Sequence, residues 1–354
     1  MPGSPCPKLM QYGPCGGVTL DGACEVAPEP CAFLDVGTVR WHGTPGAGDG
    51  ATRGAARMRG ILAHRPVVVA DFPARALDAG SLAACARALA GHVDAVLAGD
   101  SGAARVQLPP SYRAHLIQSE GVAVWAGLTC RDRNRVAMEG ELAALAHAGV
   151  AAVHCVTGDH PLTGSRPDAR PVFDLDSTRA AHLARAAGHL VSVAESPASP
   201  PADRRPARLV EKLRAGAEIC FVNHAGGAGP VAAFIRRARD LGATGGFVPC
   251  VPAVFDRESA ALLRSFTTLV LPDGHLDGIL AAGTGAAGTR AAGIRAAAAL
   301  AQEFLALDGV VGVNLSGGPG PGHELEFAEA LAATAEAIGV IPAGGSPASR
   351  PASR

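Results

Sequence analysis

Eight short apolar runs, separated by segments with helical periodicity, constrain the fold of this chain more than any other feature of its sequence. Each run is nearly continuous in apolar residues, as expected for strands of a parallel sheet whose two faces are both buried. The regular alternation of these strands with helices predicts an α/β fold, a (β/α)8 TIM barrel, with an open doubly wound sheet as the alternative. The predicted strands are Pro66–Ala70, Val93–Ala98, Val122–Leu128, Ala151–Val156, Leu190–Ala194, Ile219–Val222, Gly246–Val251 and Val310–Leu315.

Helical patterns fill the intervals between these runs. The long interval before the last strand holds Asp273–Asp277 and a Gly/Ala-rich stretch, which together predict a loop with an extra turn. The predicted helices are 55–64, Ser81–Leu89, Arg135–Ala148, Ser177–Ala187, Arg208–Ala215, Val231–Leu241, Glu258–Phe266, Ala291–Leu307 and Glu324–Ile338.

Composition divides the chain into four parts. Residues 1–36 are rich in cysteine, 37–54 form a Gly-, Thr- and Pro-rich linker, 55–340 form the barrel, and the Ser/Pro/Arg-rich tail 341–354 is expected to be disordered. The formal net charge of −1 argues against binding to nucleic acid or to an anionic membrane. The sequence shows no apolar run long enough to span a membrane and no apolar signal region at its start, so we expect a soluble, cytoplasmic protein.

Four of the nine cysteines crowd into the first 31 residues, at Cys6, Cys15, Cys24 and Cys31. Gly and Pro fill the gaps between them, and a segment this short cannot bury a core of its own. Because a cytoplasmic protein rarely forms disulfides, four thiolates around zinc or an iron–sulfur cluster are the predicted arrangement. A flexible cysteine-bearing arm is the alternative.

Polar side chains follow the predicted strands, where a TIM barrel holds its ligand site. Asp71 follows the first strand, and Thr157-Gly158-Asp159 follows the fourth. Glu195 and Asn223 follow the fifth and the sixth. Each residue alone is more often a helix cap than a catalytic group. Their convergence on one mouth predicts a site, with Asp159 and Asp71 as candidate catalytic acids.

Several motifs resemble those of the methylenetetrahydrofolate reductases, in the family's order and near its spacing. The N-terminal Cys-Pro-Lys…Gly-Pro-Cys-Gly-Gly segment is also similar to a cysteine module that accompanies some members of that family. The matching barrel motifs are Leu128–Arg135, Thr157–Pro161, Phe173–Ser177, Lys212–Ala217 and Phe247–Pro252.

This resemblance implies a TIM barrel in which NAD(P)H reduces FAD, and the flavin passes hydride to 5,10-methylenetetrahydrofolate to give 5-methyltetrahydrofolate. Asp159 matches an Asp beside the flavin that also faces the folate, and Asn223 matches the Gln that holds the pterin. Phe173 matches an aromatic residue beside the FAD, and Lys212 a Lys on a cofactor-contacting helix. Thr157 stands where the family has a flavin-binding Arg, so we count it with the cofactor-binding candidates.

The sequence also departs from the family at positions that carry its chemistry. The proton-donating Glu is replaced by Ala70, and Asp71 follows it. Because neighbouring side chains of a strand point to opposite faces, Asp71 is expected to substitute for the Glu only if a bulge or the strand's end re-aims it. Gly127 and Gly99 replace a His and a Thr of the family.

These departures leave two alternatives to the flavin-dependent reductase. One is direct hydride transfer from NADH to the folate without a flavin. The other is a non-catalytic or redirected folate-binding paralogue, a partner subunit in one-carbon metabolism that docks a redox protein through its cysteine segment. Assembly into a homo-oligomer is compatible with each of the three.

Overall fold

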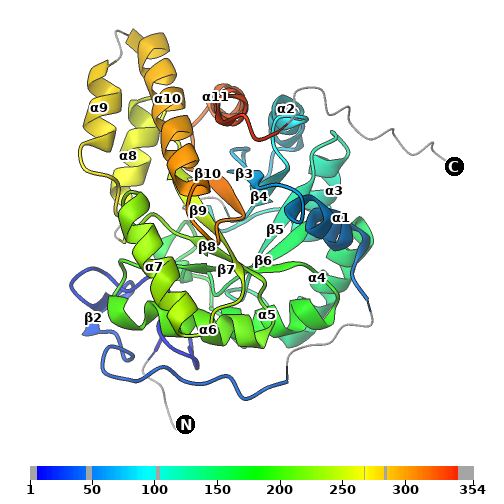
Figure 1. Cartoon of the computed structure of the whole chain (residues 1–354). Helices are drawn as coiled ribbons and strands as arrows, with labels where there is room; N and C mark the ends of the chain where they lie inside the picture. The colour runs from blue at the N-terminus through cyan, green and yellow to red at the C-terminus, as the bar shows by residue number, and fades with distance from the viewer. Residues whose placement is uncertain (1–5, 45–49, 101–103, 267, 283–284, 342–354) are drawn as a thin grey trace, which may run out of the picture.

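A closed barrel of eight parallel strands organises the molecule, as the computed structural model shows for residues 6–44, 50–100, 104–266, 268–282 and 285–341. The strand order around the barrel is β10-β3-β4-β5-β6-β7-β8-β9, with helices outside it (Figure 1). The predicted (β/α)8 TIM barrel is therefore confirmed. The barrel strands are β3 (Val67–Asp71), β4 (Ala95–Ala98), β5 (Val124–Thr129), β6 (Ala152–Val156), β7 (Val191–Glu195), β8 (Ile219–Val222), β9 (Gly246–Pro252) and β10 (Gly312–Ser316).

The helices follow the predicted pattern with two differences. The helix α3 (Pro110–Gln118) was not predicted, because its apolar residues form no clear stripe. The predicted loop before the last strand contains α9 (His275–Ala282), and α10 starts at Gly285, since alanine-rich sequence favours helix. The other helices are α1 (Arg53–Leu62), α2 (Ala79–Leu89), α4 (Arg135–Ala148), α5 (Ser177–Ala186), α6 (Arg205–Ala215), α7 (Ala228–Asp240), α8 (Arg257–Ser265), α10 (Gly285–Leu305) and α11 (Glu324–Ile338).

Side chains along each strand alternate between two apolar cores. Val68 and Ala70 of β3 belong to the outer core, which the strands share with the helices. Val67 and Val69 belong to the inner core, which fills the barrel lumen. The same period of two places Asp71 on the lumen side, at the carboxyl end of its strand.

The lumen is filled below the strand ends. The Trp125 indole N–H donates to the Ser192 hydroxyl at 2.8 Å, and His154 Nδ1 lies 2.8 Å from the same oxygen. Burial lowers the pKa of His154 to about 3, so this imidazole is neutral. Ala55 and Met58 of α1 join the same core, and Gly54 approaches the backbone just before β6. A ligand can therefore enter only from the carboxyl ends of the strands.

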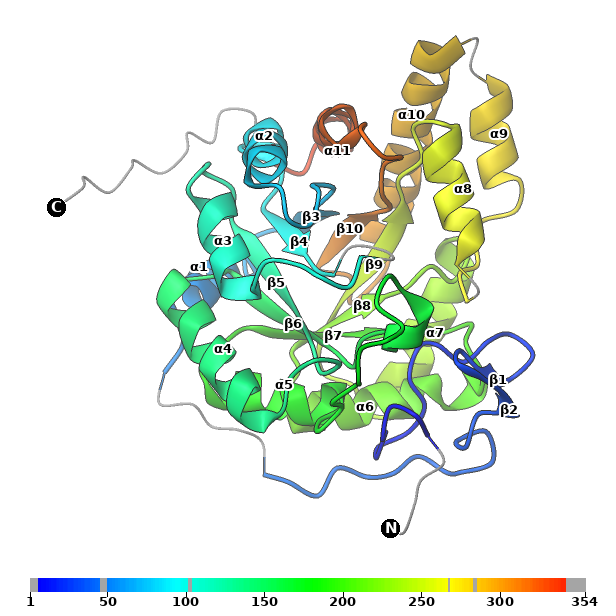
Figure 2. The same cartoon turned by 180° about the vertical axis from the view of Figure 1, so that it is seen from behind.

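The N-terminal segment, residues 6–44, forms a separate layer beside α6 and α7 (Figure 2). Its two-stranded antiparallel sheet consists of β1 (Ala23–Cys24) and β2 (Ala27–Pro30). The Trp41 backbone N–H donates to Glu211 Oε2 of α6 at 2.7 Å, and Arg204 donates to the Leu34 carbonyl at 2.6 Å. These contacts attach the segment to α6. The predicted tail beyond residue 341 lies outside the described residues.

The described helices include none that is long and apolar enough to cross a membrane.

Strands β4 and β5 approach each other closely at Gly127. A Cβ atom built on Gly127 would lie 2.6 Å from the Gly99 Cα and 3.1 Å from the Ala98 carbonyl oxygen. These neighbours are backbone atoms, which cannot rotate away. The two glycines that replace a His and a Thr of the family are therefore packed together, and a side chain at Gly127 has no room.

Substitution of Gly127 by Ala tests this packing. We expect Gly127→Ala to lower the free energy of unfolding by about 1–3 kcal/mol, because the new methyl group forces the strand backbones apart. Gly140→Ala is the matched control, since Gly140 is exposed on α4 with open space around its Cα. It should raise the free energy of unfolding by about 0.5–1 kcal/mol. Urea unfolding of both variants decides, and equal effects would contradict the proposed close approach.

Candidate functional site

Asp71 lies at the mouth of the barrel, on the lumen face of β3. The pairing of β3 with β4 matches Val69 with Ala95, Ala70 with Val96 and Asp71 with Leu97, in continuous register. Asp71 is the last residue of β3 and reaches the lumen without a bulge, whereas the expectation that position 70 faces the lumen is wrong. The regular alternation already puts Asp71 inside, and it turns Ala70 outward into the core shared with the helices.

Hydrogen bonds from β10 and the loop after it hold the Asp71 carboxylate. Asn314 Nδ2 donates to Oδ1 at 2.9 Å, and the Gly317 backbone N–H donates to Oδ2 at 3.2 Å. Burial nevertheless raises the pKa of Asp71 above its ordinary value, although the bonds from Asn314, Ser316 and Gly317 oppose that rise. A buried acid that holds its proton more readily than usual is suited to general acid chemistry.

Sequence reasoning missed Asn314, which lies 1% exposed inside the lumen. Its amide oxygen has no hydrogen-bond partner among the described residues, while its amide nitrogen holds Asp71. The available signal was a single amide inside the otherwise apolar run Val310–Leu315. A polar residue in a buried strand needs a partner, and here the partner is the candidate acid.

Asn223 and Ser196 form a second polar pair at the mouth. Asn223 Nδ2 donates to the Ser196 hydroxyl at 2.8 Å across the ends of β8 and β7. Ser196 is buried, whereas Asn223 is half-buried. The amide oxygen of Asn223 is not used in this bond, so the pair can present an acceptor to a ligand at the strand ends.

Asp159 follows β6 in an exposed loop. Its carboxylate is 66% exposed and lies 3.8 Å from Arg105 Nη1. The next residue, His160, is buried, and its backbone N–H donates to Glu25 of the N-terminal segment at 3.0 Å. The structure therefore keeps Asp159 accessible at the rim, whereas Asp71 lies inside the lumen. The two predicted acids have different surroundings.

Three of the four side chains assigned to cofactor binding are engaged in packing, and the fourth is the exposed Asp159. The Thr157 hydroxyl accepts the Ser177 backbone N–H at 3.2 Å, and Thr157 is 7% exposed. Phe173 is 2% exposed and stacks on His160, with their ring centroids 5.9 Å apart. Lys212 Nζ donates to Glu195 Oε2 at 2.7 Å.

Glu195 forms an ion pair with Lys212, so the Lys212 ammonium group is not available to an anionic cofactor. Arg205 Nη1 also lies 3.3 Å from Glu195 Oε1, and all three side chains are buried. Burial alone would raise the pKa of Glu195, but the attraction of Lys212 and Arg205 outweighs it and leaves that pKa below its ordinary value. Because these groups satisfy each other, the side chains matched to the family's flavin site do not fit an FAD in this arrangement.

The four N-terminal cysteines lie near one another, and no disulfide joins them in the described part of the chain. Burial raises the pKa of Cys31, and Cys15, Cys6 and Cys24 add to the rise because their negative charges repel a Cys31 thiolate. Across the residues that the structure describes, however, no three His, Cys, Asp or Glu side chains form a group that could hold a metal ion. Thiols are suitable ligands for zinc or an iron–sulfur cluster. In this structure, however, the four thiols are not arranged as the ligands of a metal ion.

A pocket opens beside the ends of β3 and β4. Arg113 forms its floor, donating to the Gly99 and Ala98 carbonyl oxygens at 2.8 and 2.6 Å. Phe72, which follows Asp71, contributes a half-buried aromatic ring. The pocket is lined by Phe72, Ala74, Arg75, Ala76, Leu82, Ala98, Gly99, Gln107 and Arg113.

Comparisons with known families match most of the chain. Residues 93–316 match the methylenetetrahydrofolate reductase family. Residues 1–40 match a family described as the C terminal of methylene-tetrahydrofolate reductase. A search of curated proteins found no match.

Solved structures similar to this chain include three proteins of low sequence identity. An uncharacterized protein from Clostridium thermocellum, which binds two copies of 5-methyl-5,6,7,8-tetrahydrofolic acid, is 9% identical, with 77% of this chain and 96% of that one covered and a TM-score of 0.53. A 2,3-dimethylmalate lyase is 15% identical, with 74% and 81% covered and a TM-score of 0.45. An oxaloacetate acetylhydrolase is 15% identical, with 66% and 85% covered and a TM-score of 0.43.

The pH dependence of stability tests the environment of Asp71. Because its pKa is raised in the folded chain, ionisation costs more free energy there than in the unfolded chain. As the pH rises from below the ordinary Asp pKa of about 3.9 through the higher folded-state pKa, the wild type should lose stability relative to Asp71→Asn, and the difference should then level off. Urea unfolding across this pH range measures it.

Asp168→Asn is the control for that titration. Asp168 is exposed, and its hydrogen bond with Arg166 lowers its pKa, so any trend should be small and of opposite sign. If the amide introduced by Asp71→Asn itself destabilises the fold, the free energy of unfolding of Asp71→Asn is lower by the same amount at every pH. The pH dependence of the difference from the wild type is then unchanged. A stability difference between wild type and Asp71→Asn that is constant with pH contradicts a raised pKa.

Proposed function

The chain belongs to the methylenetetrahydrofolate reductase family, and from that premise we propose that its barrel mouth binds a tetrahydrofolate and reduces its one-carbon bridge. The substrate would be 5,10-methylenetetrahydrofolate and the product 5-methyltetrahydrofolate. The observation that carries this proposal is the Asp71 carboxyl group, which faces the lumen with a raised pKa.

The reaction needs an acid and a hydride donor. Opening the five-membered ring transfers a proton to the departing nitrogen and leaves an iminium carbon, which then accepts hydride. Asp71 supplies a carboxyl that retains its proton more readily than an exposed Asp. Asn314 and Gly317 hold that carboxyl in a fixed orientation, so it needs little reorganisation when the proton moves.

Folate as the ligand class has two further supports. The Asn223–Ser196 pair offers an amide at the strand ends, the side-chain type that pairs with a pterin edge. The similar barrel from Clostridium thermocellum binds 5-methyl-5,6,7,8-tetrahydrofolic acid. Asp159 stands exposed at the rim, where it is available to a bound ligand.

The hydride comes either from FAD reduced by NAD(P)H or directly from the nicotinamide. The FAD route would require Lys212, Phe173 and Thr157 to leave their present contacts, because these side chains as packed do not fit the cofactor. Direct transfer is favoured by the ion pairs that occupy Lys212 and by the burial of Phe173 and Thr157. We therefore keep a flavin-independent reductase as the second candidate function.

The N-terminal cysteines are proposed to bind zinc or an iron–sulfur cluster. Cys6, Cys15 and Cys24 lie close enough to Cys31 to raise the pKa of its thiol, which supports this assignment. Metal analysis with an absorption spectrum distinguishes the two metals, and a protein without stoichiometric metal would remove the assignment.

Purified protein tests the function through its spectrum and its turnover. We expect oxidation of NAD(P)H that depends on methylenetetrahydrofolate. Yellow protein with a flavin spectrum would select the flavin-dependent reaction, and colourless active protein the direct one. Folded protein that binds the folate without turnover would instead identify a non-catalytic folate-binding paralogue.

The variant Asp71→Asn separates catalysis from binding. Without the proton donor, kcat should fall by about 10²–10⁴-fold, while the KM for the folate changes little. Asp308→Asn, an exposed carboxylate in the turn before β10 and so at the end of the barrel opposite the mouth, should keep wild-type kinetics. Steady-state kinetics decide, and an unchanged kcat in Asp71→Asn would exclude Asp71 as the acid.

A further inference from the structure

The N-terminal segment reaches the barrel mouth through residues 15–18. The Val18 carbonyl oxygen accepts the Ser199 hydroxyl at 2.9 Å, and the Gly16 carbonyl oxygen accepts the Thr268 hydroxyl at 3.4 Å. Ser199 is 0% exposed and Val18 is 1% exposed. Ser199 lies in the loop after β7, and Thr268 lies in the loop between α8 and α9. This part of the segment is therefore built onto loops that follow the strands.

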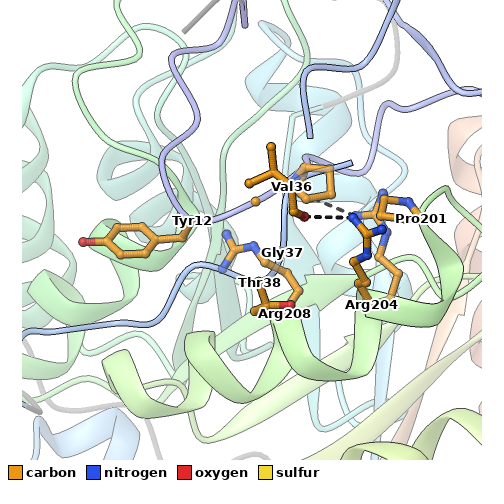
Figure 3. Close-up of a pocket in the computed structure, with 10 residues that line it drawn as sticks. Tyr12, Val36, Gly37, Thr38, Pro201, Arg204 and Arg208 are labelled. Carbon is orange, nitrogen blue, oxygen red and sulfur yellow. Dashed lines mark hydrogen bonds between the residues drawn. The ribbon is translucent and has the colours of Figure 1, made fainter. Parts of the chain in front are cut away.

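A second stretch of the segment is anchored on the barrel by Arg204. Its Nη1 atom donates to the Leu34 and Val36 carbonyl oxygens at 2.6 and 2.8 Å. Figure 3 shows the Arg204 side chain reaching Val36, with Gly37 next to it in the chain. A Cβ atom built on Gly37 would meet no atom within 4 Å. The segment is thus held at two places, and Gly37 is a position where an added methyl group has room.

Gly16 lies against the polar pair at the mouth. A Cβ atom built on Gly16 would be 3.2 Å from the Ser196 Oγ, which is closer than ordinary van der Waals contact. That oxygen is the acceptor of the Asn223 Nδ2 hydrogen bond at 2.8 Å. Ser196 is buried, whereas Gly16 is exposed. The segment therefore covers Ser196 at the border between the pair and solvent.

The position of the Ser196 hydroxyl determines how the Asn223 amide is turned. A side-chain amide has a donor end and an acceptor end. While Nδ2 donates to Ser196, the amide oxygen remains for a ligand. If the hydroxyl is pushed aside, Nδ2 loses its acceptor and the amide is free to rotate. The backbone at position 16 thereby controls a ligand-facing group that it does not touch.

The neighbouring Gly17 makes room for a second contact with the mouth. A Cβ atom on Gly17 would overlap the Glu25 carboxylate. Glu25 accepts the His160 backbone N–H at 3.0 Å, and His160 follows Asp159 in the chain. The two adjacent glycines therefore let the segment approach two loops of the mouth, the one after β6 and the one after β7.

We propose that the N-terminal segment forms one wall of the ligand site, and that Gly16 is a positioning residue that fixes the Asn223 amide through Ser196. This inference rests on the proposed function, because it takes the folate as the ligand of Asn223. The barrel without its N-terminal segment would then have an incomplete site. The segment has this role whatever its cysteines bind.

The variant Gly16→Ala tests the proposal in the full chain. The backbone of Gly16 is outside the left-handed region, so alanine can adopt its conformation. The new methyl group should displace the Ser196 hydroxyl and raise the Kd for 5-methyltetrahydrofolate by about 2- to 10-fold, as for the loss of one hydrogen bond. Gly37→Ala, in the same segment, should bind as the wild type does. Equal Kd values for Gly16→Ala and the wild type contradict the proposal.

A double-mutant cycle with Ser196→Ala tests the route. Ser196→Ala should weaken folate binding by itself, because Asn223 Nδ2 loses its acceptor. Adding Gly16→Ala should then cause no further loss, since the hydroxyl it displaces is gone. A loss of equal size in both backgrounds overturns the proposal, and a disturbance of Cys15 would give that result. If Gly16→Ala alone fails to fold, recovery of folding in the double variant supports the proposal, and no recovery overturns it.

Hydrogen exchange of the ligand-free chain decides independently of the folate. The Asn223 backbone N–H donates to the Glu195 carbonyl at 2.9 Å, and the Ser199 N–H donates to the Ser196 carbonyl at 3.0 Å. Exchange in residues 195–199 and 222–224 should be faster in Gly16→Ala than in the wild type and Gly37→Ala. If the wild type binds no folate, the proposed function fails, and this comparison still shows whether the segment positions Asn223. Unchanged exchange in folded Gly16→Ala overturns the inference.

Discussion

The alternation of side chains along closed parallel strands determines which residues of this protein meet a ligand. In β3 it sends Val68 and Ala70 to the helices and Val67, Val69 and Asp71 to the lumen. In β10 the same period brings Asn314 beneath Asp71 and fixes its carboxylate. A shift of one residue in β3 would replace the acid in the lumen by an apolar side chain and turn the acid towards the helices, and a shift in β10 would remove the Asn314 amide from Asp71. The candidate chemistry therefore depends on the register of the barrel.

The fold could be predicted from the sequence because its signal is local. Continuous apolar runs such as Ile219–Val222 mark strands buried on both faces, and their spacing leaves room for a helix. The face of β3 that carries Asp71 was predicted incorrectly. The family motif put position 70 on the lumen face, whereas the strand pairing puts Ala70 towards the helices. Only the neighbouring strands establish the register. Asn314 was missed for a related reason, since its partner Asp71 lies far away in the sequence.

The N-terminal segment is part of the surroundings of the barrel mouth. Lys8 lies 4% exposed and pairs with Glu25 at 2.6 Å, and Glu25 accepts the His160 backbone N–H. The loop that carries Asp159 is thus supported by the cysteine-rich segment. Any change in the conformation of that segment, including the binding of a metal by its thiols, would act on the rim of the mouth through a single carboxylate. The cysteine-rich segment and the loop that carries Asp159 are therefore physically connected in this chain.

The buried face of α6 explains why the N-terminal segment docks there. Arg205, Arg208 and Lys212 are spaced by three and four residues, so they lie on the same side of the helix. The single carboxylate of Glu195 pairs with the first and the third. The helix face therefore keeps an excess of positive charge, and carbonyl oxygens of the segment gather on it, as the Cys15 carbonyl does at 3.0 Å from Arg205 Nη1. Carbonyl dipoles stabilise a cation only in part, and for Arg208, whose N–H groups have no hydrogen-bond acceptor among the described residues, the nearby carboxylates of Asp176, Glu195 and Glu211 moderate the cost of burial.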